Sequence, residues 1–178
     1  MTADQRDQAD RADRADLRAR NRSAVELYLR TGLAERLERY RLYTEDGTAA
    51  LWFTDIGRPI VVQGWADLRR HGELSVRVLP DWSWHDVSVV EAVDPGVIWV
   101  ECRGAGTIRF PGYPEGRYEN HFLLCFDLVD GRIARSREIS NPVEQMRALG
   151  IEVPRIERGW IPARDRDEAP GPAPRRNG

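Results

Sequence analysis

Residues 110–122, FPGYPEGRYENHF, are the most informative part of this chain. Two prolines and two glycines lie between runs that alternate like strands, which predicts a shaped loop over residues 111–116 that joins two strands. Side chains alternate across a strand, so Tyr118, Asn120 and Phe122 should share one face. A polar group between aromatic ones is typical of a pocket wall, because a packed core rarely holds an asparagine without a partner. The second strand is therefore expected to line a pocket.

Strand and helix patterns extend on both sides of this loop. Asp130 and Gly131 form the strongest short hairpin signal in the sequence. The predicted strands cover residues 84–93, 97–110, 117–129 and 132–139, with short pieces over 51–62, and the predicted helices begin at Asn21 and Leu33 and cover residues 64–78 and 142–149. Helices followed by a long antiparallel meander indicate an α+β domain, in which a curved sheet wraps around a long helix as a cone with a mouth.

The composition excludes several classes of protein. The 178 residues carry a net charge of -2, so no global field attracts nucleic acid or an anionic membrane. No apolar run is long enough to cross a bilayer, and no apolar signal core stands at the N-terminus. All 27 cationic residues are arginines, which makes a lysine Schiff base impossible. We therefore expect a cytoplasmic protein that acts on a small molecule, with Cys102 and Cys125 as buried free thiols.

The chain divides into three segments by composition. Residues 1–20 repeat aspartate every third position with arginines between and lack an apolar stripe, which predicts a disordered polar lead. Residues 21–163 contain the predicted helices and strands, and their number suits one domain. Residues 164–178 are rich in proline and arginine, which predicts a disordered tail.

Several unusual motifs are spread over the chain. They are residues 110–122, residues 80–84 (PDWSW), Arg137 with Glu138, Trp52 with Thr54 and Asp55, and Ile151 with Val153 and Pro154. In these motifs, and over residues 21–163, the chain strongly resembles the phenazine biosynthesis proteins A and B, small dimeric enzymes of the SnoaL-like, NTF2-like superfamily. The resemblance implies an NTF2-like/SnoaL-like cone, with a curved antiparallel sheet packed against N-terminal helices. Because a shared fold says little about chemistry, the candidate residues are considered one by one.

Glu138 is the candidate general acid. Alternation along the last predicted strand places Ala134, Ser136 and Glu138 on one face, and Ile133, Arg135, Arg137 and Ile139 on the other. A glutamate on a cavity wall has its charged form disfavoured, so its pKa rises and it can hold a proton near neutral pH. The alternative is a strand-end glutamate paired with Arg135 or Arg137. In the family that the chain resembles, the position of Glu138 holds the catalytic acid.

His71 and Ser75 lie four residues apart on the third predicted helix, so they share one helical face. Histidine is the usual proton carrier near neutral pH, and a serine one turn away can orient it or bind a carboxylate. A lone helical histidine is more often a spectator. The resemblance places both residues at active-site positions. Some duplicated copies in the family lack the catalytic pair, so the presence of His71 with Glu138 favours an active copy.

Arg39 and Tyr118 are candidate substrate-binding residues. By pattern alone, Arg39 is a solvated surface charge and Tyr118 is a core tyrosine. The resemblance places Arg39 where the family binds a substrate carboxylate across the dimer interface, and it places Tyr118 in the pocket. A guanidinium suits the role of Arg39 because it meets a carboxylate with two parallel hydrogen bonds.

Other chemistries fit the sequence poorly. His71 and Ser75 on one helix are badly placed as a nucleophile–base pair, and the chain has no G-x-S-x-G elbow. The three histidines and two cysteines lack metal-ligand spacing, so no metal site is predicted. Gly104 and Gly106 lack the third glycine and following helix of a dinucleotide fingerprint, so no such cofactor is predicted. On a strand, these glycines permit curvature and close approach of a ligand.

The resemblance implies a cofactor-independent condensation of two carboxylated cyclic amino-ketones, with loss of water, to a reduced phenazine dicarboxylate. It also implies a homodimer, and it leaves open whether a paralogous chain replaces one subunit. Two other classes remain: a different SnoaL-like cyclase or isomerase, and a non-catalytic ligand-binding dimer partner. An apolar pocket in which Arg39 has no role would favour the cyclase or isomerase. Binding without turnover would favour the ligand-binding partner.

Overall fold

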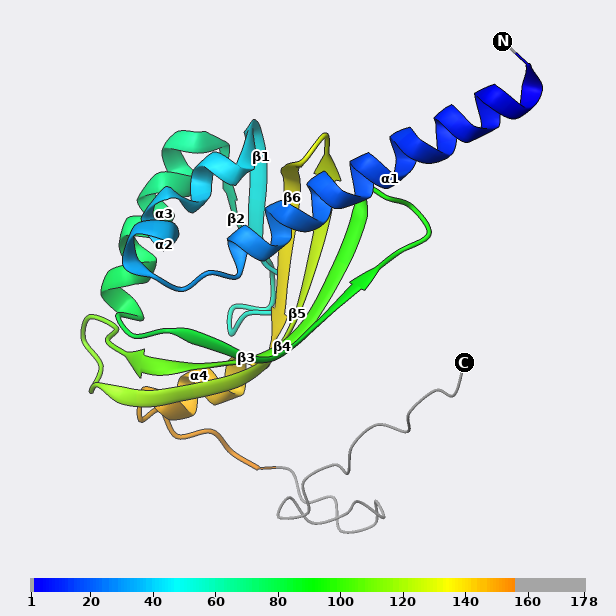
Figure 1. The fold of residues 1–178 in the computed structure, drawn as a ribbon. Coiled ribbons are helices and arrows are strands. Elements are labelled where there is room, and N and C mark those ends of the chain that lie inside the picture. Colours follow the sequence, from blue (N-terminus) through cyan, green and yellow to red (C-terminus); the bar gives the residue numbers. More distant parts are fainter. Residues whose placement is uncertain (1, 156–178) are drawn as a thin grey trace, which may run out of the picture.

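A curved sheet of six strands is the centre of the computed structural model, which describes residues 2–155 of the chain (Figure 1). The strand order is β2-β1-β6-β5-β4-β3. Strands β1 and β6 run parallel, and every other neighbouring pair is antiparallel. The strands are β1 (Tyr43–Leu51), β2 (Ile60–Gln63), β3 (Ser83–Glu91), β4 (Val97–Ile108), β5 (Gly116–Val129) and β6 (Arg132–Ser140).

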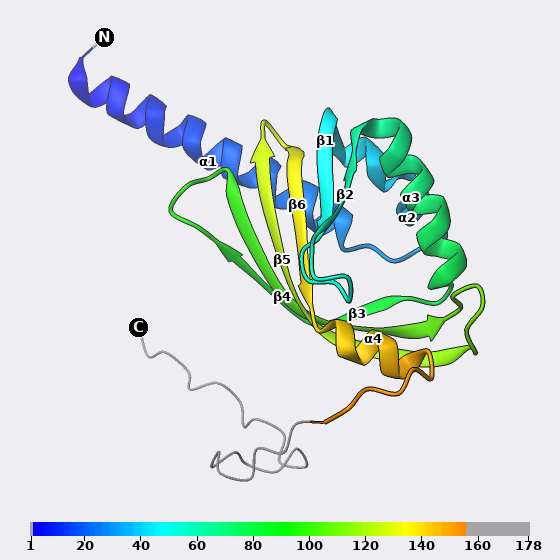
Figure 2. The same cartoon turned by 180° about the vertical axis from the view of Figure 1, so that it is seen from behind.

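Helices cover one face of this sheet. Helix α1 crosses that face diagonally, and α2 and α3 stand beside β1 on the same side (Figures 1 and 2). The helices are α1 (Ala3–Tyr28), α2 (Leu33–Glu38), the 3-10 helix η1 (Arg39–Leu42), α3 (Gly64–Val78) and α4 (Pro142–Ala148). The predicted α+β architecture is confirmed, and the bounds of β3 to β6, α3 and α4 agree with the prediction within two residues. Strand β1 begins well before the strand region expected over residues 51–62.

Residues 3–20 are helical, so the expectation of a disordered lead is wrong for this segment. A capping box between Thr2 and Gln5 starts α1, and Arg11 pairs with Asp7 one turn away at 2.6 Å. Such pairs stabilise a helix without any apolar stripe. Figure 1 shows this part of α1 projecting beyond the sheet, which explains why its sequence has no face for packing. The tail expected over residues 164–178 lies outside the described residues.

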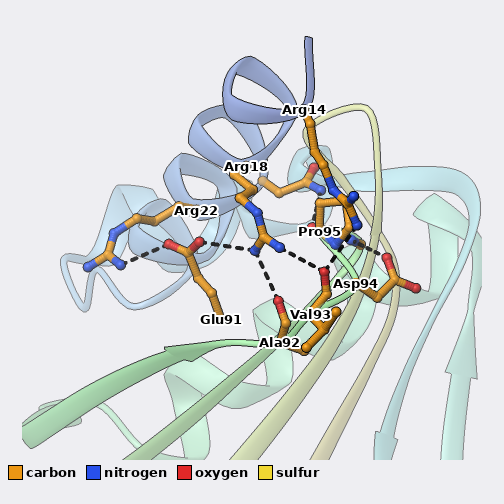
Figure 3. Close-up of polar contacts among 10 residues, drawn as sticks. Arg14, Arg18, Arg22, Glu91, Ala92, Val93, Asp94 and Pro95 are labelled. Atoms are coloured by element: carbon orange, nitrogen blue, oxygen red, sulfur yellow. Dashed lines mark hydrogen bonds and ion pairs between the residues drawn. The ribbon is translucent and has the colours of Figure 1, made fainter. Parts of the chain in front are cut away.

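Polar contacts fasten the middle of α1 to the turn between β3 and β4 (Figure 3). Arg18 donates hydrogen bonds to the carbonyl oxygens of Ala92 at 3.0 Å and Val93 at 2.7 Å. Glu91 lies between Arg18 and Arg22 and pairs with both, at 3.4 and 3.1 Å. These contacts fix the direction of α1 over the sheet.

Asn21 joins α1 to two turns at once. Its side chain is fully buried, donates to the carbonyl oxygen of Pro95 at 2.8 Å and accepts from the N–H of Gly131 at 2.8 Å. Further along α1, Val25 is fully buried and the Tyr28 ring packs edge-on against Phe126, with ring centroids 4.9 Å apart. The C-terminal end of α1 therefore lies against the inner face of the sheet.

A bulge in β6 changes the faces predicted for that strand. Asp127 pairs with Arg135 and Leu128 pairs with Ile133, so Ala134 is an extra residue. Ile133 therefore faces the core and is fully buried, although simple alternation placed it with Arg135. Beyond the bulge the alternation holds, and Ser136 is buried where its Oγ lies 2.6 Å from the hydroxyl of Tyr43.

Gly104 makes room for aromatic rings. A Cβ at this position would collide with Trp82 and would lie 2.7 Å from Trp84 and 2.9 Å from Phe122. The three rings meet edge to face, with centroids 5.0 to 5.7 Å apart. The predicted close approach at this glycine is therefore made by the protein's own side chains, which form one end of the cavity described below.

We predict that Gly104→Ala destabilises the fold and Gly106→Ala does so less. The added methyl group at position 104 overpacks three rigid rings, which costs on the order of 1–3 kcal/mol or more. At position 106 the nearest atoms to an added Cβ lie 3.0 to 3.2 Å away, so smaller shifts suffice. Urea unfolding of both variants measures the difference. Equal stabilities would show that the aromatic cluster can move away at little cost.

Candidate active site

A cavity of about 200 Å³ lies between the inner face of the sheet and the helices α2, η1 and α3. All strands except β4, the end of α1, helix α4 and the loops between β1 and β2 and between β4 and β5 also contribute to its wall. All of the site residues singled out from the sequence line this one cavity: Glu138, His71, Ser75, Arg39 and Tyr118. Arg39 lines the cavity of its own chain.

Glu138 carries its carboxyl group into the cavity from β6, beside Leu51 of β1 and Leu124 of β5 in the strand register. Burial disfavours the carboxylate and raises the pKa of Glu138 to about 7, and the positive charge of Arg39 opposes this rise. The backbone carbonyl of Glu138 accepts from the N–H of Trp52 at 2.8 Å. Within residues 2–155, the carboxyl group itself takes part in no hydrogen bond or ion pair. A proton is thus held on Glu138 up to neutral pH.

The arginines beside Glu138 in the sequence do not neutralise it. Arg135 and Arg137 point to the opposite face of the sheet, where both pair with Asp127 at 2.5 and 2.8 Å. The ordinary strand-end ion pair that the sequence left open is therefore absent from the described part of the chain.

His71 lines the cavity from α3 and is itself exposed to solvent. Loss of hydration lowers the pKa of His71 below its ordinary value, and the charge of Arg39 lowers it further. A neutral imidazole at physiological pH can accept a proton as well as donate one. His71 and Glu138 both respond to the charge of Arg39, which places all three side chains in one electrostatic environment.

Arg39 is held by two contacts that leave part of its guanidinium free. Its guanidinium carbon lies 4.4 Å from the ring centroid of Tyr28, and one Nη donates to the carbonyl oxygen of Arg30 at 2.9 Å. A cation over a ring face is attracted to it by about 0.5–2 kcal/mol, depending on exposure. Arg39 is therefore held in place at the cavity wall rather than free in solvent.

Arg36 is a buried cavity residue that the sequence analysis missed. It is 3% exposed, and its Nη atoms donate to the carbonyl oxygens of Leu79 at 2.6 Å and Ser75 at 3.0 Å. One Nη also donates to the Oγ of Ser75 at 3.1 Å. Burial and the charge of Arg39 lower the pKa of Arg36 to about 10. The i, i+3 spacing of Arg36 and Arg39 on one helical face is the sequence signal that could have found it.

Tyr118 stacks on Trp82, with ring centroids 5.4 Å apart, and it forms part of the aromatic end of the cavity. Burial raises the pKa of Tyr118 to about 12, so its hydroxyl stays protonated. Asn120 lies beside it on the same strand face, as predicted, and donates to the Tyr118 hydroxyl at 3.0 Å and the Asn141 carbonyl at 2.8 Å. Asn120 therefore has protein partners and orients Tyr118.

Several described residues of the cavity wall carry a buried hydrogen-bond donor that has no acceptor. Among the described residues, the buried side-chain donors without an acceptor are the Nε–H groups of Arg36, Arg39 and Arg137 and the indole N–H of Trp84. All of these except Arg137 belong to residues that line the cavity. Unpaired buried donors are costly, so their concentration here points to a ligand rich in acceptor oxygens.

The part of the chain that the structure describes contains no cluster of three or more side chains suited to a metal ion. In the same residues, no helix is long and apolar enough to cross a bilayer.

Comparison with known proteins assigns the chain to a family. The profile of phenazine biosynthesis protein A/B matches residues 1–163. The chain belongs to the phenazine biosynthesis protein A/B family. The phenazine biosynthesis protein PhzB of Pseudomonas fluorescens is 55% identical over 147 residues, which cover 83% of this chain and 91% of that protein. Membership of this family gives the protein a role in phenazine biosynthesis.

Solved structures agree with this assignment. The crystal structure of a phenazine biosynthesis-related protein (phzb2) from Pseudomonas aeruginosa superimposes with a TM-score of 0.81 at 50% identity, over 83% of this chain and 91% of that one. A putative SnoaL-like polyketide cyclase from Jannaschia superimposes with a TM-score of 0.60 at 17% identity, over 76% and 94% of the two chains. The likeness to the Jannaschia protein shows that this chain has the SnoaL-like fold.

Glu138→Gln should remove a pH-dependent loss of stability. The carboxyl pKa is raised from 4.5 to about 7, so between these values the folded state keeps a proton that the unfolded state releases. The stabilisation that this proton provides is therefore fully present below about pH 4.5, and it is lost as the pH rises through about 7. Relative to the variant, the wild type should lose up to about 3 kcal/mol over this window. Urea unfolding at about pH 5 and about pH 8 measures the change.

Glu101→Gln is the matched control, because Glu101 is an exposed glutamate on the other face of the sheet. Its unfolding free energy should follow that of the wild type at both pH values. If Glu138→Gln also runs parallel to the wild type, the carboxyl group is ionised in the folded protein and burial does not control it.

Proposed function

We propose that this protein catalyses the condensation of two carboxylated cyclic amino-ketones to a reduced phenazine dicarboxylate. The amine of each molecule attacks the ketone of the other, and each of the two carbinolamines loses one water. The observation that carries the proposal is a half-buried glutamate on the cavity wall whose carboxyl pKa lies at about 7 and which responds to the charge of Arg39, in a member of this family. Such a site can bind carboxylates and deliver a proton without ionising at rest.

Glu138 is assigned the role of general acid. As the amine nitrogen bonds to the carbonyl carbon, the carbonyl oxygen gains negative charge and takes the proton of Glu138. The nitrogen becomes positively charged and releases its proton to neutral His71 or back to Glu138. Loss of the hydroxyl group as water needs a second proton delivery to oxygen, which Glu138 can supply once it is reprotonated. General acid catalysis of this type contributes roughly 10²- to 10⁴-fold.

Arg39 and Ser75 are assigned the binding of the substrate carboxylates, and Tyr118 belongs to the wall that holds the rings. Holding both reactants in one cavity makes a bimolecular reaction effectively intramolecular, which can supply a large part of the rate. A cyclase or isomerase acting on an uncharged polycyclic substrate would leave Arg39 without a role. The placement of Arg39 at the cavity wall favours the carboxylated substrate.

Glu138→Gln should slow condensation about 10²- to 10⁴-fold while retaining affinity for a dicarboxylated phenazine. The wild-type rate should fall as the pH rises through about 7, because Glu138 loses its proton there. The residual rate of the variant should lack this decline. Product formation by purified protein, followed by absorbance and corrected for the uncatalysed rate, measures both effects.

Glu73→Gln serves as the control for this assay, since Glu73 is an exposed glutamate on α3 that pairs with Arg69. It should retain the wild-type rate and pH profile. An unchanged rate in Glu138→Gln would remove the general acid from the mechanism. Binding of the dicarboxylate by the wild type without any turnover would instead identify a ligand-binding protein.

We also propose that the chain forms a homodimer through the outer face of the sheet. Figure 2 shows this face, where β4, β5 and β6 are free of the long helices. Trp99 and Leu123 are 38% and 42% exposed there, next to Val90 at 55%. Exposed apolar side chains on one sheet face are typical of an interface, and a face that belongs to one chain can pair with its own copy.

Trp99→Arg should convert the dimer into a monomer, because it places a charge at the centre of the apolar face. Light scattering on a sizing column measures the mass, and retained turnover would show that each chain holds a complete site. Val93→Arg is the control, since Val93 is 87% exposed at the β3–β4 turn. A wild-type mass of one chain would contradict the dimer.

A further inference from the structure

Arg36 brings a positive charge into the cavity wall, and the acid that acts on this charge, Asp81, forms no ion pair with it in the described chain. Arg36 is 3% exposed, and none of the ion pairs among residues 2–155 includes it. Its hydrogen-bond partners are the carbonyl oxygens of Ser75 and Leu79 and the hydroxyl of Ser75. Carbonyls at the end of α3 stabilise a cation in part, through the helix dipole. A buried charge without a counter-ion still costs free energy that a bound anion would recover.

Ser75 connects the guanidinium of Arg36 to the cavity. The Oγ of Ser75 accepts a hydrogen bond from Arg36 at 3.1 Å, and Ser75 lines the cavity. Within the described chain, the hydroxyl hydrogen of Ser75 is donated to no protein acceptor. A hydroxyl that accepts from a guanidinium becomes a stronger donor, because hydrogen bonds polarise one another in sequence. The free hydrogen of Ser75 is therefore prepared to bind an acceptor oxygen.

The charges that line the cavity define what it can bind. Arg36 and Arg39 are both cationic, His71 is held neutral, and Glu138 holds its proton up to neutral pH. Asp55 also lines the cavity, but it lies exposed on the loop at the mouth. Among the described residues that line the cavity, the two guanidiniums are thus accompanied by two carboxyl groups, those of Glu138 and the exposed Asp55. A ligand with two negative groups matches this arrangement.

We propose that Arg36 is a positioning residue for a second carboxylate subsite, in which the Ser75 hydroxyl donates to one carboxylate while Arg39 binds the other. The ligand class is a dicarboxylate with a flat apolar body, or two monocarboxylates bound side by side. This inference rests on the proposed function, which already gives Ser75 a carboxylate, and adds Arg36 as the residue that positions the Ser75 hydroxyl. Trp82, Trp84 and Tyr118 provide the apolar surface for the rings.

The test measures ligand affinity by isothermal titration calorimetry. The probes are a phenazine dicarboxylate, a phenazine monocarboxylate and unsubstituted phenazine. Ser75→Ala and Arg36→Met should each weaken dicarboxylate binding roughly 10- to 100-fold, the loss expected for a charge-assisted hydrogen bond. Neither change should alter the affinity for unsubstituted phenazine. Arg36→Lys, which keeps the charge but lacks the planar fork, should give an intermediate loss.

A double-mutant cycle separates positioning from a general structural role. If Arg36 acts through Ser75, the two losses of affinity should not add. The double variant with Arg36→Met and Ser75→Ala should then bind the dicarboxylate with about the affinity of the weaker-binding single variant. Losses from Ser75→Ala and Arg39→Met should instead add, because those residues hold different carboxylates. Arg69→Met is the matched control, as Arg69 is an exposed arginine on α3 that pairs with Glu73. Its affinity for all three probes should equal that of the wild type.

Each result has a defined meaning. If Arg36→Met fails to fold, Ser75→Ala and Arg36→Lys carry the test, because each keeps a cation at position 36. Unchanged dicarboxylate affinity in these two variants overturns the second subsite. If the wild type still turns over substrate in that case, the proposed function stands without it. A wild type that neither binds the dicarboxylate nor turns over substrate overturns both proposals.

Discussion

The separation of Glu138 from its neighbouring arginines is the interaction on which the site depends. Strand alternation sends Arg135 and Arg137 to the outer face, where Asp127 neutralises both. Glu138 is left on the inner face beside apolar strand neighbours, with Arg39 as the charge that acts on it. Had either neighbouring arginine reached the cavity, the carboxyl group would be an ordinary ionised partner. The raised pKa is thus a product of strand geometry.

The scaffold serves this arrangement from several sides. Gly104 lets the rings of Trp82, Trp84 and Phe122 close one end of the cavity. Asn21 fixes α1 to two turns, so that Tyr28 at the end of that helix meets the guanidinium of Arg39. The cationic side chains Arg36 and Arg39 therefore lie on helices. The acid Glu138 and most of the aromatic wall lie on the sheet. Packing in one part of the chain sets the electrostatics in another.

Sequence reasoning found the features that depend on local pattern. The α3 helix, the strands β3 to β6 and the inner-face position of Glu138 follow from periodicities that tertiary structure leaves intact. Ile133 was misplaced because a bulge inserts Ala134, and a one-residue insertion reverses the faces of a strand. Residues 3–20 were misjudged because ion pairs and a capping box replaced the apolar stripe. Arg36 was missed because its burial depends on how α2 packs against α3.

Ligand charge and acid strength are coupled in this cavity. The positive charge of Arg39 lowers the pKa of Glu138 and opposes the effect of burial. A carboxylate bound to Arg39 neutralises that charge and excludes water, and both changes favour the protonated form of Glu138. Under the proposed function, the substrate itself would therefore hold the general acid in its active state. An uncharged ligand of the same shape would leave Arg39 unneutralised and Glu138 more readily ionised.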